Sequence, residues 1–172
     1  MLKRLLLILF AINFLAIEAF CVCPVSIATP MQSLEKQLTE GLAPLHEYVI
    51  FTHTPTGFAV SVKDELMFDE CGELNDAGKL LLNVIATIMK QSGRKWLILC
   101  HTDKGATQID RISKTSLKAG AITDYLTDQE KCLINQIFPI GFGSIMPIKS
   151  NKAIGKGLHN RVDFITEEFN LN

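Results

Sequence analysis

The stretch Trp96-Leu97-Ile98-Leu99-Cys100-His101-Thr102-Asp103 decides the fold. Its first five residues are all apolar, which is typical of a strand that is buried on both faces of a sheet. The run then ends abruptly in three polar residues, His101, Thr102 and Asp103. Polar groups at the end of a strand are both rigidly held and accessible, so a binding site is expected at this point of the chain.

Helical patterns flank this strand on both sides. Upstream, Asn75 and Asp76 predict a helix start, because a short polar side chain can accept free backbone N–H groups and a carboxylate suits the helix dipole. Apolar residues then recur at helical spacing as far as Ser92. Downstream, a second helix is predicted from about Thr107 to Leu126. The residues expected on its inner side are Leu117, Ala121, Ile122 and Tyr125.

Further β-rich segments complete a small sheet. They are Tyr48 to His53 and Phe58 to Val62, which form an opening strand or hairpin, Gln136 to Ile140, and Arg161 to Thr166. The last segment alternates charged and apolar residues. The resulting order, β-α-β-α-β-β, predicts an α/β (α+β) two-layer sandwich with two main helices packed on one face of a small mixed sheet.

The first 19 residues have the composition of an export signal. Lys3 and Arg4 precede an apolar stretch from Leu5 to Ile17, and the small Ala19 suits a cleavage point. The apolar stretch is shorter than the roughly 20 residues that a membrane span needs, although an uncleaved anchor stays open as the alternative. We therefore expect an exported, periplasmic protein.

Cys21 follows this signal directly, as the acylated cysteine does in bacterial lipoproteins. Of the residues before it, only Ala19 fits the usual lipobox, so both lipidation of Cys21 and attachment to the outer membrane through that lipid stay open. The chain has five cysteines, and the odd number means that at least one is unpaired or modified. The Cys21-Val22-Cys23 pair has no second cysteine pair or histidine cluster to complete a zinc site, so no metal or cofactor is expected.

The length of 172 residues and the apolar content of 48% suit one compact domain. We expect residues 46–168 to form this domain and residues 169–172 to be a tail. Residues 20–45 are predicted to be a tether that contains one short helix. Without residues 1–19 the chain keeps 15 basic and 17 acidic side chains, which argues against a nucleic-acid partner.

The polar strand end belongs to a longer ordered pattern. Ten residues separate Cys100-His101-Thr102-Asp103 from Lys114-Thr115-Ser116-Leu117-Lys118. Later come Gly141-Phe142-Gly143, Pro147, Asn151, Gly155 and His159-Asn160-Arg161-Val162-Asp163. Over about Tyr48 to Glu167 this set resembles the OmpA-like family, which has a GHTD-type strand end, an LSxxR helix start, a GxG…P…N loop and an NRRVE-type last strand.

The resemblance implies a non-catalytic domain that binds the peptide stem of peptidoglycan in the Gram-negative periplasm. In that family, the aspartate at the position of Asp103 and the arginine at the position of Lys118 clamp diaminopimelate. Such a ligand end is zwitterionic, so a carboxylate suits its ammonium and a cation suits its carboxylate. Further ligand contacts are expected at Thr102, His101 and Phe68. Structural roles or possible ligand contacts are expected at Asn151, Arg161 and Asp163.

Three departures from the family pattern predict a divergent member. Lys118 stands where the family has arginine, and it offers a point charge in place of a planar two-pronged donor, so weaker ligand binding is expected. Cys100 replaces the glycine of the GHTD pattern. His159-Asn160-Arg161 keeps one of the two arginines.

Two alternatives stay open beside wall binding. The first is a structural subunit of a cell-envelope secretion complex, similar to the small OmpA-like outer-membrane subunit of Dot/Icm (type IVB) machines, with weakened or lost peptidoglycan binding and with protein partners. The second is a periplasmic cysteine hydrolase built on Cys100 and His101. Neighbours on a strand point to opposite faces, so this pair does not favour catalysis, and no catalytic residue is assigned.

Overall fold

The computed structural model describes residues 30–54, 57–145 and 159–167. The predicted export signal, the lipidation site Cys21 and the possible ligand contact Asn151 lie outside these residues. Within the described ranges, no helix is long and apolar enough to cross a membrane.

The sheet has five strands in the order β1-β2-β5-β3-β4. The strands are β1 (Val49–Thr54), β2 (Gly57–Lys63), β3 (Trp96–His101), β4 (Ile137–Gly143) and β5 (Arg161–Glu167). Strands β3 and β4 run parallel, while the other neighbouring strands run antiparallel, so the sheet is mixed as predicted. The opening segment is a hairpin, β1–β2, rather than a single strand.

The helices are α2 (Pro30–Gly41), the short α3 (Asp64–Met67), α4 (Asp76–Ser92) and α5 (Gln108–Asp124), and α5 continues into a π-helical turn, Tyr125–Gln129. Helices α4 and α5 begin where the sequence predicts, and α4 also ends at the predicted residue, whereas the short α3 was not predicted. The Asn75 side chain accepts the backbone N–H of Gly78 at 2.7 Å, which caps α4. Gly93 ends the same helix in the left-handed conformation, at φ +62°.

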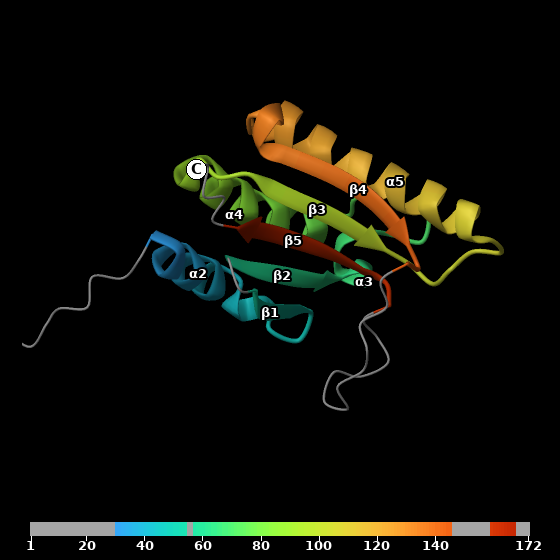
Figure 1. Ribbon diagram of the computed structural model, residues 1–172, viewed down its shortest axis with the longest axis horizontal. Coiled ribbons are helices and arrows are strands. Elements are labelled where there is room, and N and C mark those ends of the chain that lie inside the picture. Colours follow the sequence, from blue (N-terminus) through green and yellow to red (C-terminus); the bar gives the residue numbers. More distant parts are fainter. Residues whose placement is uncertain (1–29, 55–56, 146–158, 168–172) are drawn as a thin grey trace, which may run out of the picture.

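One face of the sheet carries the hydrophobic core. Val60, Phe164 and Ile98 are neighbours across β2, β5 and β3, and all three are fully buried. Ile85 of α4 and Ile122 of α5 belong to the same core cluster. Figure 1 shows both helices behind the sheet, on the same side. The predicted two-layer sandwich is therefore confirmed.

Helix α2 packs into this core instead of standing apart from it. Its leucines Leu34 and Leu38, and Leu42 just after it, are all buried in the core cluster, where α2 lies against α4. The helical spacing of these leucines gives α2 one apolar side, which is stabilised by burial. The part of the predicted 20–45 tether that the structure describes thus belongs to the domain.

Helix α5 packs on the sheet only partly as predicted: Ile122 is buried as expected, whereas Leu117 is not. Leu117, expected on the inner side, is 73% exposed. The buried positions are Thr115, Ala119, Ile122 and Thr123, and three of these are small side chains. Small residues let α5 approach the sheet closely, and Leu117 is consequently left on the outside.

Two glycines of β4 make this close approach possible. A Cβ at Gly141 would lie 2.4 Å from the backbone nitrogen of Ser116, so only hydrogen fits there. Gly143 has φ +56° and donates its N–H to the Thr115 hydroxyl at 3.0 Å. The GxG segment therefore sets the position of α5 against the end of the sheet.

The sheet face opposite the helices holds a buried polar cluster at one end. Arg161 Nε donates to both carboxylate oxygens of Asp163 at 3.0 Å, and His101 Nε2 lies 3.1 Å from Asp163 Oδ2. Phe142 stacks on the His101 ring. Arg161 and Asp163 can thus be buried, because their charges neutralise one another. The sequence left Arg161 and Asp163 as structural residues or possible ligand contacts, and in the structure they pair with each other, while Asp163 also pairs across strands with His101.

The pKa of Asp163 reflects this cluster. Burial alone would raise it, but the contact with His101, the positive charge of Arg161 and a hydrogen bond with Ser61 lower the pKa below its ordinary value. The charged carboxylate is therefore the form that the folded protein stabilises.

We expect Gly141→Ala to destabilise the domain by about 1–3 kcal/mol, because the added methyl group meets the α5 backbone. Gly120→Ala, within α5, is the matched control: nothing lies within 4 Å of its added Cβ, and it should stabilise the helix by about 0.5–1 kcal/mol. Urea unfolding of both variants measures the difference. Equal stability of the two proteins would contradict the close contact.

Asp163→Asn should lower the free energy of unfolding by about 3 kcal/mol at pH 7, because it removes a negative charge that both oxygens of the Asp163 carboxylate present to the buried Arg161. The folded-state pKa of Asp163 lies below the ordinary 3.8. Its contribution is therefore present above pH 3.8 and is lost as the pH falls through the lower folded-state pKa. In urea unfolding at a series of pH values, the difference in the free energy of unfolding between the variant and the parent should shrink as the pH falls below 3.8, whereas the exposed Asp128→Asn should match the parent throughout.

Candidate functional site

A cavity of about 610 Å³ opens at the end of the sheet where β3 stops. It lies between α5, the loop that follows α3, and the loop that follows β3. Five carboxylates and three lysines line it. They are Asp64, Asp69, Glu70, Glu73 and Asp124, with Lys104, Lys114 and Lys118. The cavity thus presents both signs of charge, with carboxylates in excess.

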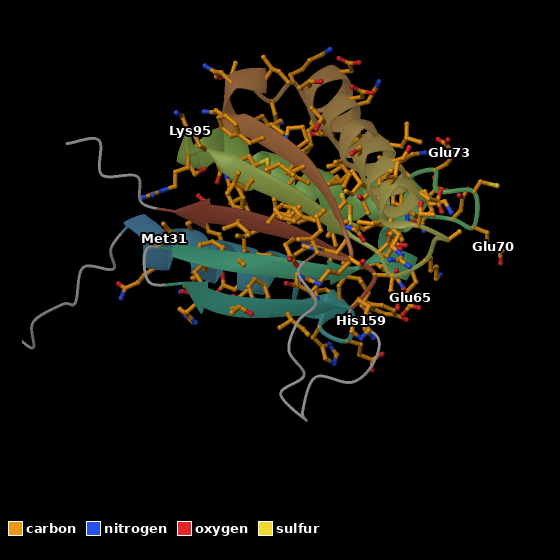
Figure 2. The ribbon with its side chains drawn as sticks, turned by 45° about the vertical axis from the view of Figure 1, so that its right-hand side comes forward. Met31, Glu65, Glu70, Glu73, Lys95 and His159 are labelled. Atoms are coloured by element: carbon orange, nitrogen blue, oxygen red, sulfur yellow. The ribbon has the colours of Figure 1, made fainter. Side chains whose placement is uncertain are left out.

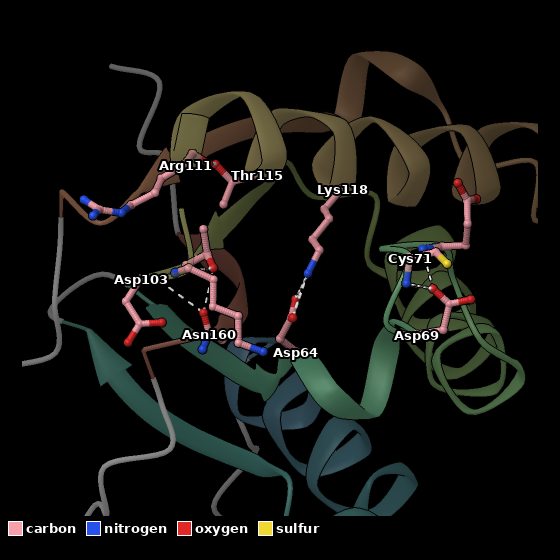
Figure 3. Close-up of polar contacts among 11 residues, drawn as sticks. Asp64, Asp69, Cys71, Asp103, Arg111, Thr115, Lys118 and Asn160 are labelled. Atoms are coloured by element: carbon pink, nitrogen blue, oxygen red, sulfur yellow. Dashed lines mark hydrogen bonds and ion pairs between the residues drawn. The ribbon is translucent and has the colours of Figure 1, made fainter. Parts of the chain in front are cut away.

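Lys118 extends from α5 toward the first residue of α3, as Figure 3 shows. Its Nζ lies 2.6 Å and 2.7 Å from the two carboxylate oxygens of Asp64. The side chains are 18% and 15% exposed, so water screens this ion pair little. The Phe68 ring supports the same ammonium, with its centroid 4.7 Å from Nζ. Lys118 is therefore held in one place by a carboxylate and an aromatic face.

Asp103 lies beside the cavity and not opposite Lys118 within it. Its side chain is exposed and lines a small neighbouring hollow of about 20 Å³, together with Ser144 and His159. Thr102 lines both hollows, so it stands between them. The two residues of the predicted clamp therefore share one end of the sheet, in adjacent hollows, with Thr102 between these.

Asn160 fixes the loop that carries Asp103. Its side-chain oxygen accepts the Thr102 hydroxyl at 2.6 Å and the backbone N–H of Asp103 at 3.2 Å. The Thr102 hydroxyl oxygen in turn accepts the N–H of Lys104. Asn160 stands where the family pattern has an arginine, and its positioning role was not foreseen from the sequence. The available signal was a polar asparagine directly before the β-rich segment that begins at Arg161.

The other predicted ligand contacts are largely buried. Phe68 is buried beneath Lys118, and Thr102 uses its hydroxyl on Asn160. His101 belongs with Arg161 and Asp163 to the polar cluster on the opposite sheet face. In this arrangement these side chains hold the walls of the site, and Lys118, Asp64 and Asp103 carry its charges.

The loop after α3 forms an acidic rim on the cavity. Asp69 accepts the backbone N–H groups of Cys71 and Glu73, both at 2.9 Å, so its carboxylate holds the loop in a turn. Figure 2 shows Glu70 and Glu73 projecting at this end of the molecule. A cationic group that enters the cavity would therefore meet carboxylates on this side.

The geometry does not support the hydrolase alternative as the sequence framed it. Cys100 is buried in the core, and burial raises the pKa of its thiol far above the ordinary value, so the nucleophilic thiolate is disfavoured. His101 follows it on β3 but lies in the polar cluster on the other face. Among the described residues, no group of three His, Cys, Asp or Glu side chains could hold a metal ion.

Comparison with known proteins rests on structure. No family model matches the sequence, and no curated protein matches it significantly. A MotB-like protein from Desulfovibrio vulgaris is similar in structure at 14% identity, with 80% of this chain and 93% of that chain covered and a TM-score of 0.64. The cell wall anchor of the T6SS from Pseudomonas aeruginosa is similar at 17% identity, with coverages of 76% and 97% and a TM-score of 0.60.

A third similar structure is the OmpA-like domain of FopA1 from Francisella tularensis. The identity is 20%, the coverages are 69% of this chain and 79% of that one, and the TM-score is 0.51. The mixed sheet with its helices on one face and the similarity to these three structures point to the same fold. The chain has the OmpA-like fold that its ordered motifs predict.

Proposed function

We propose that this protein is a non-catalytic envelope protein that binds the peptide stem of peptidoglycan in the cavity beside Lys118. The observation that carries the proposal is the charge arrangement at the end of β3, where an ammonium and several carboxylates line one cavity. A diaminopimelate end carries an ammonium and a carboxylate on the same carbon, so it needs both signs close together. The similar T6SS protein is itself described as a cell wall anchor, which supports the same role here.

The ligand would lie across Thr102. Its carboxylate would bind the ammonium of Lys118 inside the cavity, and its ammonium would bind the exposed carboxylate of Asp103 in the neighbouring hollow. Asn160 links the two ends of this site, because its side chain accepts the backbone N–H of Asp103 and its carbonyl accepts the N–H of Asp64, the partner of Lys118. A rigid separation favours a ligand whose charges match it.

The proposed setting is the periplasm, with the domain anchoring an envelope protein or the outer membrane to the wall. An acylated Cys21 would supply the attachment to the outer membrane, and peptidoglycan would be the partner on the other side. Nothing in this arrangement requires a cofactor.

A second candidate function is that of a structural subunit in an envelope secretion complex, such as a type IVB machine. The observation in its favour is the sheet face opposite the helices. There Phe138 and Ile140 of the edge strand β4 are 40% and 41% exposed, beside the half-buried Leu97. Exposed apolar side chains that cluster on a sheet suit a protein partner.

Retention on purified peptidoglycan sacculi tests the first proposal. Lys118→Met and Asp103→Ala should each reduce retention about tenfold or more, because each removes one charge-assisted contact worth about 1.5–3 kcal/mol. Lys36→Ala, on the exposed side of α2, is the matched control and should bind like the parent. Parent-like retention of both the Lys118→Met and the Asp103→Ala protein would rule out the clamp. Co-purification of a stable multi-subunit envelope complex with these proteins would then support a structural subunit of a secretion complex.

A further inference from the structure

The ion pair between Lys118 and Asp64 occupies the cation that a ligand carboxylate needs. Both oxygens of Asp64 contact Nζ, at 2.6 Å and 2.7 Å, so this carboxylate takes the place that a ligand carboxylate would fill. We infer that Asp64 is an internal competitor for Lys118, which sets how tightly the site binds an anionic ligand end. This inference rests on the proposed function and concerns the same site.

The position of Asp64 supports its role as a competitor of the ligand carboxylate for Lys118. Its backbone is fixed on both sides, since its N–H donates to the Asn160 carbonyl at 3.0 Å and its carbonyl accepts the N–H of Phe68 at 2.9 Å. The carboxylate therefore stays at the cavity wall and does not need to be ordered before it binds Lys118. A ligand, by contrast, must give up its own freedom to reach the same ammonium.

The number of donors on lysine makes the competition effective. An ammonium has three N–H donors, and two of its contacts already go to Asp64. The buried Phe68 ring lies against the same group, so the approach from that side is closed. A guanidinium has five donors in a planar fork, so an arginine could hold Asp64 with one edge and a ligand carboxylate with the other.

The size of the effect follows from how often Lys118 is free. If Asp64 leaves the ammonium available about one tenth of the time, the apparent affinity for the ligand is about tenfold weaker than the intrinsic affinity. Asp64→Asn removes the competing charge and keeps the shape of the side chain. It should therefore tighten binding by about tenfold.

The experiment is a calorimetric titration of the folded domain with the tripeptide L-Ala-γ-D-Glu-meso-diaminopimelate. Asp64→Asn should bind about tenfold more tightly than the parent. Glu65→Gln is the matched control, because it removes one exposed carboxylate next to Asp64 on α3 that does not line the cavity, and it should change the affinity less than about twofold. Adding Lys118→Met to Asp64→Asn should abolish the gain. Amidation of the diaminopimelate carboxylates should abolish it as well.

Lys118→Arg gives a second test that leaves no buried lysine without its counter-ion. The Lys118→Arg protein should bind the tripeptide several-fold more tightly than the parent. Adding Asp64→Asn to Lys118→Arg should raise the affinity for the tripeptide less than Asp64→Asn raises it in the parent. Such non-additivity is expected of two residues in one network. Thermal melting of each protein shows whether it is folded.

The outcomes separate the two proposals. If the parent binds through Lys118 but Asp64→Asn binds no better than Glu65→Gln, the proposed competition by Asp64 is overturned while the wall-binding function stands. The inference that Asp64 competes for Lys118 is equally overturned if Asp64→Asn does not fold and Lys118→Arg binds the tripeptide no better than the parent. If neither the parent nor Asp64→Asn shows any dependence on Lys118, both proposals fail.

Discussion

The contact between α5 and β4 determines the geometry of the whole candidate site. The backbone of Ser116 lies where a side chain on Gly141 would stand, and the Thr115 hydroxyl accepts the N–H of Gly143. Because a helix is rigid, fixing α5 at these residues also fixes the point from which Lys118 projects. The carbonyl of Gly143 accepts the N–H of Thr102, so the loop that carries Asp103 is tied to the same place. One packing contact thus aligns both halves of the site.

Much of this fold could be predicted from the sequence because its signals are local. Asn75 caps α4 and Gly93 ends it, as expected from side-chain hydrogen bonding and from the conformational freedom of glycine. The apolar run of β3 and the order of the motifs led to the mixed sheet with its helices on one face. These features depend on residues that are close in the chain, and periodicity describes such residues well.

The errors have physical reasons. Leu117 was placed on the inner side of α5 because leucine is usually buried, but the close contact with β4 selects Thr115 and Ala119 there. Residues 30–42 were assigned to a tether because they precede the motif-bearing part of the chain. Their leucines nevertheless complete the core against α4. Periodicity shows that a helix has an apolar side, but it does not show what that side packs against.

The candidate site was only partly predictable, because its contacts join residues far apart in the chain. Asp103 and Lys118 were singled out by the family resemblance, whereas Asp64 pairs with Lys118 over 54 positions and Asn160 holds Thr102 over 58. No local pattern encodes such pairs. The resemblance to a family with arginine at the position of Lys118 implied a ligand carboxylate as the partner of this cation, and it gave no indication of Asp64.

The exchange of arginine for lysine changes what the neighbouring carboxylate does. Beside a guanidinium, a carboxylate at position 64 would orient the cation and leave donors free for a second anion. Beside the ammonium of Lys118, the same carboxylate takes two of three donors, and the Phe68 ring covers another side. The contact that orients the Lys118 ammonium then also occupies it. If the site binds an anion as we propose, its affinity therefore depends on Asp64 as well as on the lysine itself, and an exchange of arginine for lysine that conserves charge does not conserve binding.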